Sequence, residues 1–181
     1  MLKWILCLLI TCCNFNLIAQ PVLHSARSVI YLVRHAEKET GVDPILTIAG
    51  QKRAGDLLHT LKNKHLKRIY VTQFRRTQMT ADSLRLQMPI DTVHYMADTT
   101  GEDLLHVIRN HHDEGRIILV IGHSNTIPKI IQLLGVANYP KTNIADSEFD
   151  DLFVVKYKKG KAFVKRMKYG QPSSVSSPMY H

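Results

Sequence analysis

Two short apolar stretches of the sequence each end in a histidine. The stretch in "YLVRHAEK" delivers Arg34 and His35, and the stretch in "IILVIGHSN" delivers His123. Continuous apolar runs of this length, bounded by polar residues, are typical of buried strands. Two buried strands that each present a histidine at their end indicate one site built from both. Imidazole groups gathered there are suited to chemistry near neutral pH.

A third stretch, "YVTQFRRTQMTAD", adds positive charge to the same predicted site. It reads as a strand that ends near Thr72, followed by a helix that begins near Arg75, so that Arg76 reaches the same rim. The neighbouring Arg75 is a second candidate for the rim, but it fits an exposed residue at the helix start better. Like charges gathered on a rigid rim are costly unless an anion joins them. Because guanidinium forks match phosphate geometry, the pattern favours a phosphate group as the ligand.

The elements that position these residues alternate between strand and helix. The patterns predict strands over 28–33, 68–71, 90–95 and 116–121, helices over 46–63, 75–88, 101–112 and 124–135, and a final strand pair over 151–169 that turns at Lys159 and Gly160. This order predicts a three-layer α/β/α sandwich with a mostly parallel central sheet, helices on both faces and a C-terminal edge hairpin or strand pair. Ligands of such sheets bind beyond the carboxyl ends of the central strands.

The ends of the chain are expected to lie outside this domain. Residues 1–19 read as a signal peptide, with Lys3 in a short basic start, a roughly ten-residue apolar core that is too short to span a bilayer, and Ala19 at the cleavage point. Residues 20–170 form the predicted domain, and residues 171–181, rich in Ser and Pro, a loose tail. The expected location is therefore periplasmic or secreted, with lipid anchoring through Cys12 or Cys13 as the alternative.

Composition narrows the classes of function. The three cysteines lie at positions 7, 12 and 13, inside the predicted leader, so disulfides, cysteine nucleophiles and cysteine metal sites are excluded for the remainder. The formal net charge is +9. This excess favours an anionic substrate or partner, and by itself is compatible with phosphate esters, nucleic acid or an anionic membrane face. The basic run "KYKKGKAFVKRMKY" is interpreted as a solvated strand face rather than a polyanion site.

Four motifs together resemble the histidine phosphatase superfamily, also called the phosphoglycerate mutase-like superfamily. They are "RHAE" from Arg34, "LTIAG" from Leu46, "FRRTQMTA" from Phe74 and "GHSN" from Gly122. Their order, spacing and strand context fit over Val29 to Tyr169, and the short length is similar to the small branch of the superfamily, which includes phosphohistidine phosphatases.

The resemblance implies a phosphoryl transfer through histidine, without a cofactor or metal. His35 would be the nucleophile that forms a phosphohistidine, and Arg34, Arg76 and His123 would hold the phosphoryl group. Ser124 and Asn125 begin the predicted last helix and could add backbone donors. The implied partner is a small phosphorylated substrate or a phosphohistidine protein, and neither nucleic acid nor a stable membrane span is expected.

The proton donor to the leaving group has no clear motif. The resemblance implies a carboxylate between the second and last motifs, where Asp98 and Glu102 are the candidates. Glu102 fits equally well as a first-turn residue of a helix. A third possibility is a carboxylate of the late acidic segment, whose members are Asp146, Glu148 and Asp150. Specificity is expected to lie in the loops over 41–45 and 137–147.

Alternatives to a phosphatase remain open at this stage. A non-catalytic module that binds phosphoanions or polyanions would keep the same pocket but lack a competent acid. A phosphomutase would need an extra segment to close the site, and the chain has little length for one. A metal site at the cluster His106, His111, His112 is disfavoured, because five-residue spacing does not place two ligands on one helix face.

Overall fold

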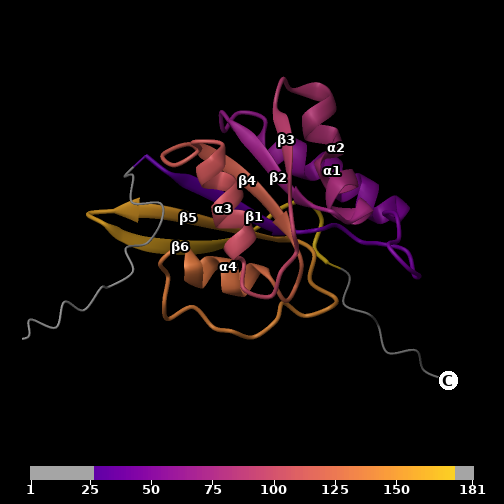
Figure 1. Cartoon of the computed structure of the whole chain (residues 1–181). Helices are drawn as coiled ribbons and strands as arrows, with labels where there is room; N and C mark the ends of the chain where they lie inside the picture. The colour runs from indigo at the N-terminus through magenta and orange to yellow at the C-terminus, as the bar shows by residue number, and fades with distance from the viewer. Residues whose placement is uncertain (1–26, 174–181) are drawn as a thin grey trace, which may run out of the picture.

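The protein folds into a single layered α/β structure around one sheet. The computed structural model describes residues 27–173, and the predicted leader lies outside the described residues. The described part contains a six-stranded sheet with helices on both faces, which confirms the predicted sandwich (Figure 1). No helix of residues 27–173 is long and apolar enough to cross a membrane.

The central strands of the sheet are parallel, and the added pair at its edge is antiparallel. The strands are β1 (Val29–Arg34), β2 (Arg68–Thr72), β3 (Asp91–Tyr95), β4 (Ile117–Gly122), β5 (Asp151–Lys158) and β6 (Lys161–Lys168). Their order is β3-β2-β4-β1-β5-β6, in which β3, β2, β4 and β1 run parallel. Because β5 pairs antiparallel with both β1 and β6, the predicted edge hairpin is confirmed.

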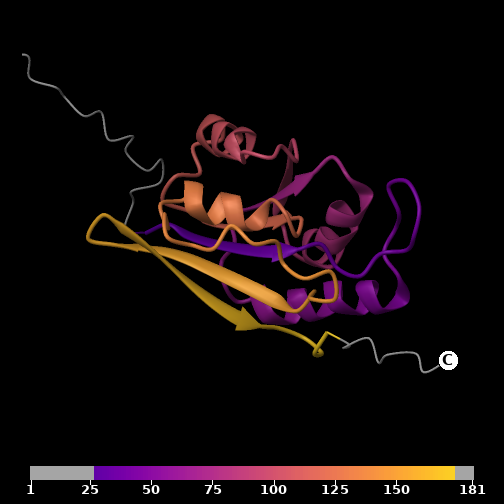
Figure 2. The same cartoon turned by 90° about the horizontal axis from the view of Figure 1, so that it is seen from below.

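Four helices cover the two faces of this sheet. They are α1 (Ile48–Leu61), α2 (Arg75–Gln87), α3 (Glu102–Asn110) and α4 (Ile127–Leu133). Helices α1 and α2 pack on one face and α3 and α4 on the other, as the view in Figure 2 shows. Alternate residues of the central strands enter the two cores, for example Leu32 and Val33, each with no exposed surface. Burying one such side chain stabilises the fold by roughly 1.5–3 kcal/mol.

The "LTIAG" motif has a local structural reason. Thr47 caps α1 by accepting a hydrogen bond from the Gly50 amide (3.1 Å). A Cβ atom at Gly50 would overlap the carbonyl oxygen of Glu37, so only glycine lets the helix approach the segment that follows His35. The motif therefore supports the loop beyond β1.

Most predicted boundaries differ from the observed ones by one or two residues, and the start of α4 differs by three. Helix α4 begins at Ile127 rather than Ser124, because the hydroxyl of Thr126 accepts from the His123 amide (3.0 Å) in a turn that precedes the helix. The predicted loose tail is held at its start. Gln171 accepts a hydrogen bond from Arg53 (2.9 Å), and the Ser173 hydroxyl donates to Asp150 (2.8 Å). The remainder of the tail lies outside the described residues.

Candidate active site

His35 follows β1 and is held in one tautomer by the backbone. It is 3% exposed, and its amide donates to the carbonyl of Gly122 on the neighbouring strand (2.9 Å). The ring nitrogen Nδ1 lies 2.8 Å from the carbonyl oxygen of Ala36. Because a carbonyl only accepts, Nδ1 carries the proton and Nε2 keeps its lone pair. Burial, with smaller contributions from His123, Arg34 and Arg76, lowers the pKa of His35 to about 3, so its imidazole is neutral at pH 7.

His123 follows β4 and lies beside His35, with the ring centroids 5.4 Å apart. Its Nε2 lies 3.0 Å from the hydroxyl of Thr72, and its Nδ1 lies 3.4 Å from Nη2 of Arg76. A guanidinium only donates, so Nδ1 accepts and Nε2 carries the proton. Burial, followed by the charges of Arg76 and Arg34, lowers the pKa of His123 to about 4. The free site therefore holds two neutral imidazoles between two cations.

The two arginines reach the pocket from different elements. Arg34 ends β1, and its Nη1 donates to the carbonyl oxygens of Ala145 (2.9 Å) and Asp146 (3.0 Å). Arg76, in the first turn of α2, has Nη1 3.8 Å from a carboxylate oxygen of Asp43. Burial lowers the pKa of both guanidinium groups, and the Nε atom of each is buried without a partner. Both cations are thus partly desolvated and available to an anion.

Aromatic rings fix the planes of the same guanidinium groups. The Phe149 ring lies 4.2 Å from the centre of the Arg34 guanidinium, and the Phe74 ring lies 4.3 Å from that of Arg76. Phe74 also meets the His123 ring edge-on, with centroids 5.3 Å apart. Stacking on an aromatic face orients a guanidinium without neutralising it.

These side chains converge on one cavity of about 410 Å³ at the carboxyl ends of β1, β2 and β4. Its lining consists of Arg34, His35, Lys38, Phe74, Arg76, Ala97, His123, Ser124, Asn125, Thr126 and Asp146. All four residues expected to bind or transfer a phosphoryl group are therefore together. Ser124 and Asn125 also line the cavity, from the turn that precedes α4.

The two predicted acids do not line this cavity. The carboxylate of Asp98 accepts from the amides of Thr100 (3.0 Å), Asp103 (3.0 Å) and Gly101, so it caps the start of α3. These hydrogen bonds lower the pKa of Asp98 against the opposing effect of burial. Glu102 is exposed in the first turn of α3. This is the alternative role, a first-turn helix residue, that the sequence suggested for it.

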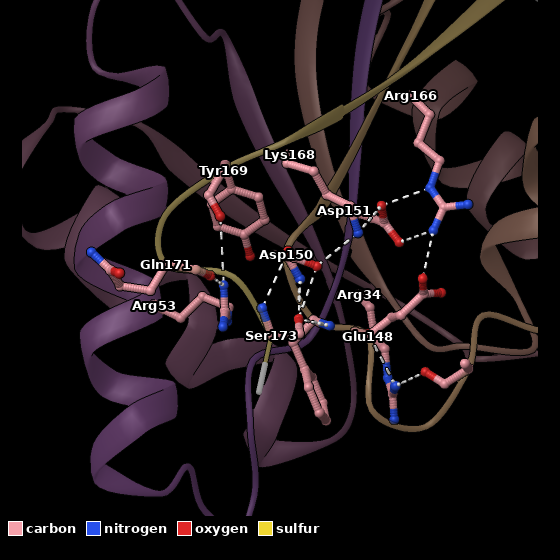
Figure 3. A network of polar contacts seen from close by, with 12 residues as sticks. Arg34, Arg53, Glu148, Asp150, Asp151, Arg166, Lys168, Tyr169, Gln171 and Ser173 are labelled. Atoms are coloured by element: carbon pink, nitrogen blue, oxygen red, sulfur yellow. Dashed lines mark hydrogen bonds and ion pairs between the residues drawn. The ribbon is translucent and has the colours of Figure 1, made fainter. Parts of the chain in front are cut away.

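The late acidic segment divides into one pocket residue, Asp146, and two structural residues, Glu148 and Asp150, whose polar contacts Figure 3 shows. Asp146 lines the cavity with a fully exposed side chain, and its carboxylate lies 3.6 Å from Nη2 of Arg34. Glu148 instead pairs with Arg166 (3.0 Å). Asp150 accepts from Lys168 (2.9 Å), and its pKa falls to about 2 because such contacts outweigh its burial. Among the described residues, Asp146 is thus the carboxylate of the cavity lining.

Glu37 of the "RHAE" motif stabilises the loop rather than the cavity. Its carboxylate accepts from Nε (2.8 Å) and Nη2 (2.6 Å) of Arg53 on α1, and this guanidinium also donates to the carbonyl of Gln171 (2.9 Å). Arg53 is 5% exposed. The pair joins the segment after His35, helix α1 and the residues after β6.

Threonines that sequence reasoning did not select hold the two histidines. The Thr72 hydroxyl lies 3.0 Å from both His123 Nε2 and the Thr77 hydroxyl, and Thr77 donates onward to the Phe74 carbonyl (2.8 Å). Thr80, one helical turn later, accepts from the Ala36 amide (3.0 Å). The three-residue spacing of Thr77 and Thr80 in "FRRTQMTA" was the available signal, because it places both hydroxyls on one face of a helix.

Comparisons with known proteins agree with this geometry. Residues 30–100 match the family model described as "Histidine phosphatase superfamily (branch 1)". The comparison with curated protein sequences found no significant match.

Several solved structures share the fold at low sequence identity. The protein histidine phosphatase SixA, solved with tungstate, aligns with a TM-score of 0.58 at 15% identity, over 77% of this chain and 96% of that chain. Phosphoserine phosphatase of Entamoeba histolytica, solved with 3-phosphoglyceric acid, aligns with a TM-score of 0.56 at 16% identity, over 80% and 97%. A mycobacterial glucosyl-3-phosphoglycerate phosphatase aligns with a TM-score of 0.58 at 12% identity, over 78% and 97%.

At these identities the structural likeness establishes the fold alone, and the family model adds the sequence link through the segment that contains Arg34, His35 and Arg76. The fold and the family match together confirm the resemblance of this chain to the histidine phosphatase superfamily.

Proposed function

We propose that the chain is a phosphatase that hydrolyses a phosphate monoester or phosphoramidate through a phosphohistidine on His35. The observation that carries the proposal is the hydrogen bond from Nδ1 of His35 to the Ala36 carbonyl (2.8 Å), in a cavity that Arg34 and Arg76 also line. It leaves Nε2 as an unprotonated nucleophile beside two cations. A neutral imidazole and fixed positive donors are the parts that phosphoryl transfer requires.

In the first step Nε2 of His35 attacks phosphorus, and the bond from phosphorus to the leaving oxygen or nitrogen breaks with its electron pair. Arg34 and Arg76 neutralise the charge on the equatorial oxygens. Burial, and after it the two guanidinium charges, lower the pKa of His123. An anion beside the ring offsets those charges, so His123 gains a proton more readily once the substrate is bound. In the second step water attacks phosphorus, the bond from phosphorus to Nε2 breaks and returns its electron pair to His35, the water proton passes to the carboxylate that protonated the leaving group, and inorganic phosphate leaves.

The leaving group also needs a proton in the first step. Asp146 is the carboxylate of the cavity lining within the described residues, so we assign it this role. Its fully exposed side chain can turn from Arg34 towards the leaving atom. Leaving groups of low basicity, such as nitrophenolate, need less of this assistance.

The test is hydrolysis of p-nitrophenyl phosphate by the wild type and by His35→Ala, with and without a metal chelator. We expect chelator-resistant turnover that His35→Ala abolishes. His59→Ala, which removes an exposed histidine of α1, is the matched control and should keep full activity. An alkaline quench after mixing with labelled substrate should trap phosphate on His35. Turnover by His35→Ala at the wild-type rate would refute the mechanism.

A binding module is the second candidate, and the placement of Asp98 and Glu102 outside the cavity favours it. Such a module would bind inorganic phosphate saturably and show neither turnover nor labelled His35. The same labelling experiment therefore separates the two candidates, because an enzyme without an efficient acid still forms the phosphohistidine from an activated substrate.

We also propose export of the chain, on the basis of the leader pattern in residues 1–19. Cell fractionation and N-terminal sequencing of the exported form test it. We expect a mature protein that begins at Gln20. A lipidated N-terminal cysteine at position 12 or 13 would instead support the anchored alternative.

A further inference from the structure

A second cavity, of about 400 Å³, lies on the face of the sheet that carries α1, beside the β5–β6 hairpin. It shares no lining residue with the candidate active site. Its lining consists of Tyr31, Thr60, Leu61, Lys64, Leu152, Val154, Lys156, Phe163, Val164, Lys165 and Met167. We call this cavity the hairpin groove. Its size lies within the range of small-molecule sites.

The register of the strands explains why the hairpin groove is apolar. Leu152 pairs with Met167, Lys156 pairs with Phe163, and residues paired across antiparallel strands point to the same face. Leu61, Leu152 and Val154 at the base of the groove are buried, whereas Phe163 and Met167 on β6 remain 55% and 41% exposed. The face of β6 predicted to be solvated is exposed, and large apolar side chains share it with lysines.

The charge of the hairpin groove has one sign. Lys64, Lys156 and Lys165 come from three different segments, and the lining contains no Asp or Glu. All three residues are exposed, and none takes part in a salt bridge within residues 27–173. The neighbouring Lys168, in contrast, is paired with both Asp150 and Asp151. Three unpaired ammonium groups around the apolar surface of the hairpin groove complement an anionic head group attached to a hydrocarbon chain.

We propose that the hairpin groove binds a single-chain anionic amphiphile, with the acyl chain against the exposed side chains of Phe163 and Met167 and the carboxylate or phosphate head among the three lysines. The concave shape of the groove, with a volume of about 400 Å³, favours an inserted chain over contact with a bilayer surface. Charge also argues against occupation by the segment 20–26 of this chain, "QPVLHSA", because it contains no acidic residue to pair with the lysines. This inference is independent of the proposed phosphatase activity.

The test uses the full chain and dodecanoate below its critical micelle concentration, at pH 8, with binding followed by titration calorimetry. We expect saturable binding of one molecule per chain. The double variant Lys156→Gln, Lys165→Gln should bind about tenfold more weakly, because two favourable charge contacts are lost. Phe163→Ser should weaken binding similarly through lost apolar contact, and its exposed position makes it compatible with folding. Hydrolysis by these variants should be unchanged.

The matched control is the double variant Lys158→Gln, Lys161→Gln, which removes the same charge from the same hairpin outside the groove lining. It should bind dodecanoate like the wild type. Equal weakening by both double variants would overturn the proposal in favour of general attraction of anions. Equal binding of the neutral dodecyl maltoside, or binding to anionic vesicles without binding of monomeric dodecanoate, would also overturn it.

Discussion

The hydroxyl of Thr80 lies 3.0 Å from the backbone nitrogen of Ala36 and accepts its hydrogen bond. The same hydroxyl donates to the backbone carbonyl of Arg76 (2.7 Å). The carbonyl of Ala36 in turn accepts from Nδ1 of His35. One side chain of α2 therefore joins the backbone of Arg76, a proposed phosphate ligand, to Ala36, the residue whose carbonyl fixes the tautomer of the proposed nucleophile.

The variant Thr80→Val should lower kcat by between about tenfold and 100-fold, with little change in KM, because small displacements of a nucleophile are costly. It should also lower the free energy of unfolding by roughly 1–3 kcal/mol, since the buried Ala36 amide loses its acceptor. Steady-state kinetics and urea unfolding measure the two effects. Thr80→Ser, which keeps the hydroxyl, should retain most activity. A Val variant with wild-type kcat would remove Thr80 from the positioning role.

The variant Asp146→Asn should separate binding from chemistry. Loss of the carboxylate beside Arg34 should tighten inhibition by inorganic phosphate by less than about fivefold, because the pair is exposed and weak. If Asp146 protonates the leaving group, kcat for phenyl phosphate should fall about 100-fold, and kcat for p-nitrophenyl phosphate much less.

Glu148→Gln is the control for Asp146→Asn, because Glu148 lies two residues later but pairs with Arg166 outside the cavity lining. It should leave both substrates unaffected. A similar fall in kcat for phenyl phosphate and p-nitrophenyl phosphate with Asp146→Asn would assign Asp146 to positioning and exclude it as the proton donor.

The buried histidines should make the protein less stable in acid. The pKa values of His35 and His123 in the folded protein are about 3 and 4, below the value of about 6.5 expected in the unfolded chain. The unfolded state thus binds more protons between these values, and stability is complete above pH 6.5 and declines as the pH falls towards 4. We expect a loss of about 3 kcal/mol per histidine between pH 6.5 and pH 4 in urea unfolding, from about 1.36 kcal/mol per pH unit.

A double variant, His35→Gln and His123→Gln, should show a flatter dependence of unfolding free energy on pH between 6.5 and 4. His59→Gln, at an exposed position, should keep the wild-type slope. Equal slopes in the double variant and the wild type would show that other groups cause the acid loss.

The order of the strands and helices could be predicted from the sequence, because the burial of each element determines its pattern of apolar residues. The run at 117–121 is apolar throughout, since β4 lies between β1 and β2 and both its faces are covered. The start of α4 could not be read, because Ser124 and Asn125 suit both a helix start and a turn, and the contact of Thr126 with the His123 amide decided between them.

Arg34, His35 and His123 could be assigned to the candidate site from the sequence, because each lies at the carboxyl end of a predicted strand, where ligands of such sheets bind. The proposed proton donor could be narrowed only to several candidates, Asp146 among them, because a carboxylate reaches the pocket only through a loop. Arg34 binds the backbone of Ala145 and Asp146 and so brings that loop to the rim, a contact between residues more than 100 positions apart. Asp98 lies in the segment where the proton donor was expected, but its carboxylate accepts hydrogen bonds from backbone amides at the start of α3.

Far from the pocket, Asp113 should contribute strongly to stability and not to catalysis. It is 2% exposed, and its carboxylate accepts from the Tyr70 hydroxyl (2.7 Å) and from Nε of Arg68 (2.6 Å). Removing one partner of such a buried pair leaves the others unpaired, so Asp113→Ala should cost about 3 kcal/mol in urea unfolding. Asp91→Ala removes an exposed carboxylate that also contacts Arg68 (3.2 Å), and should cost less than about 1 kcal/mol. Both variants should keep the wild-type kcat at temperatures where they are folded. Equal costs for the two variants would show that the burial of Asp113 adds nothing to the strength of its contacts.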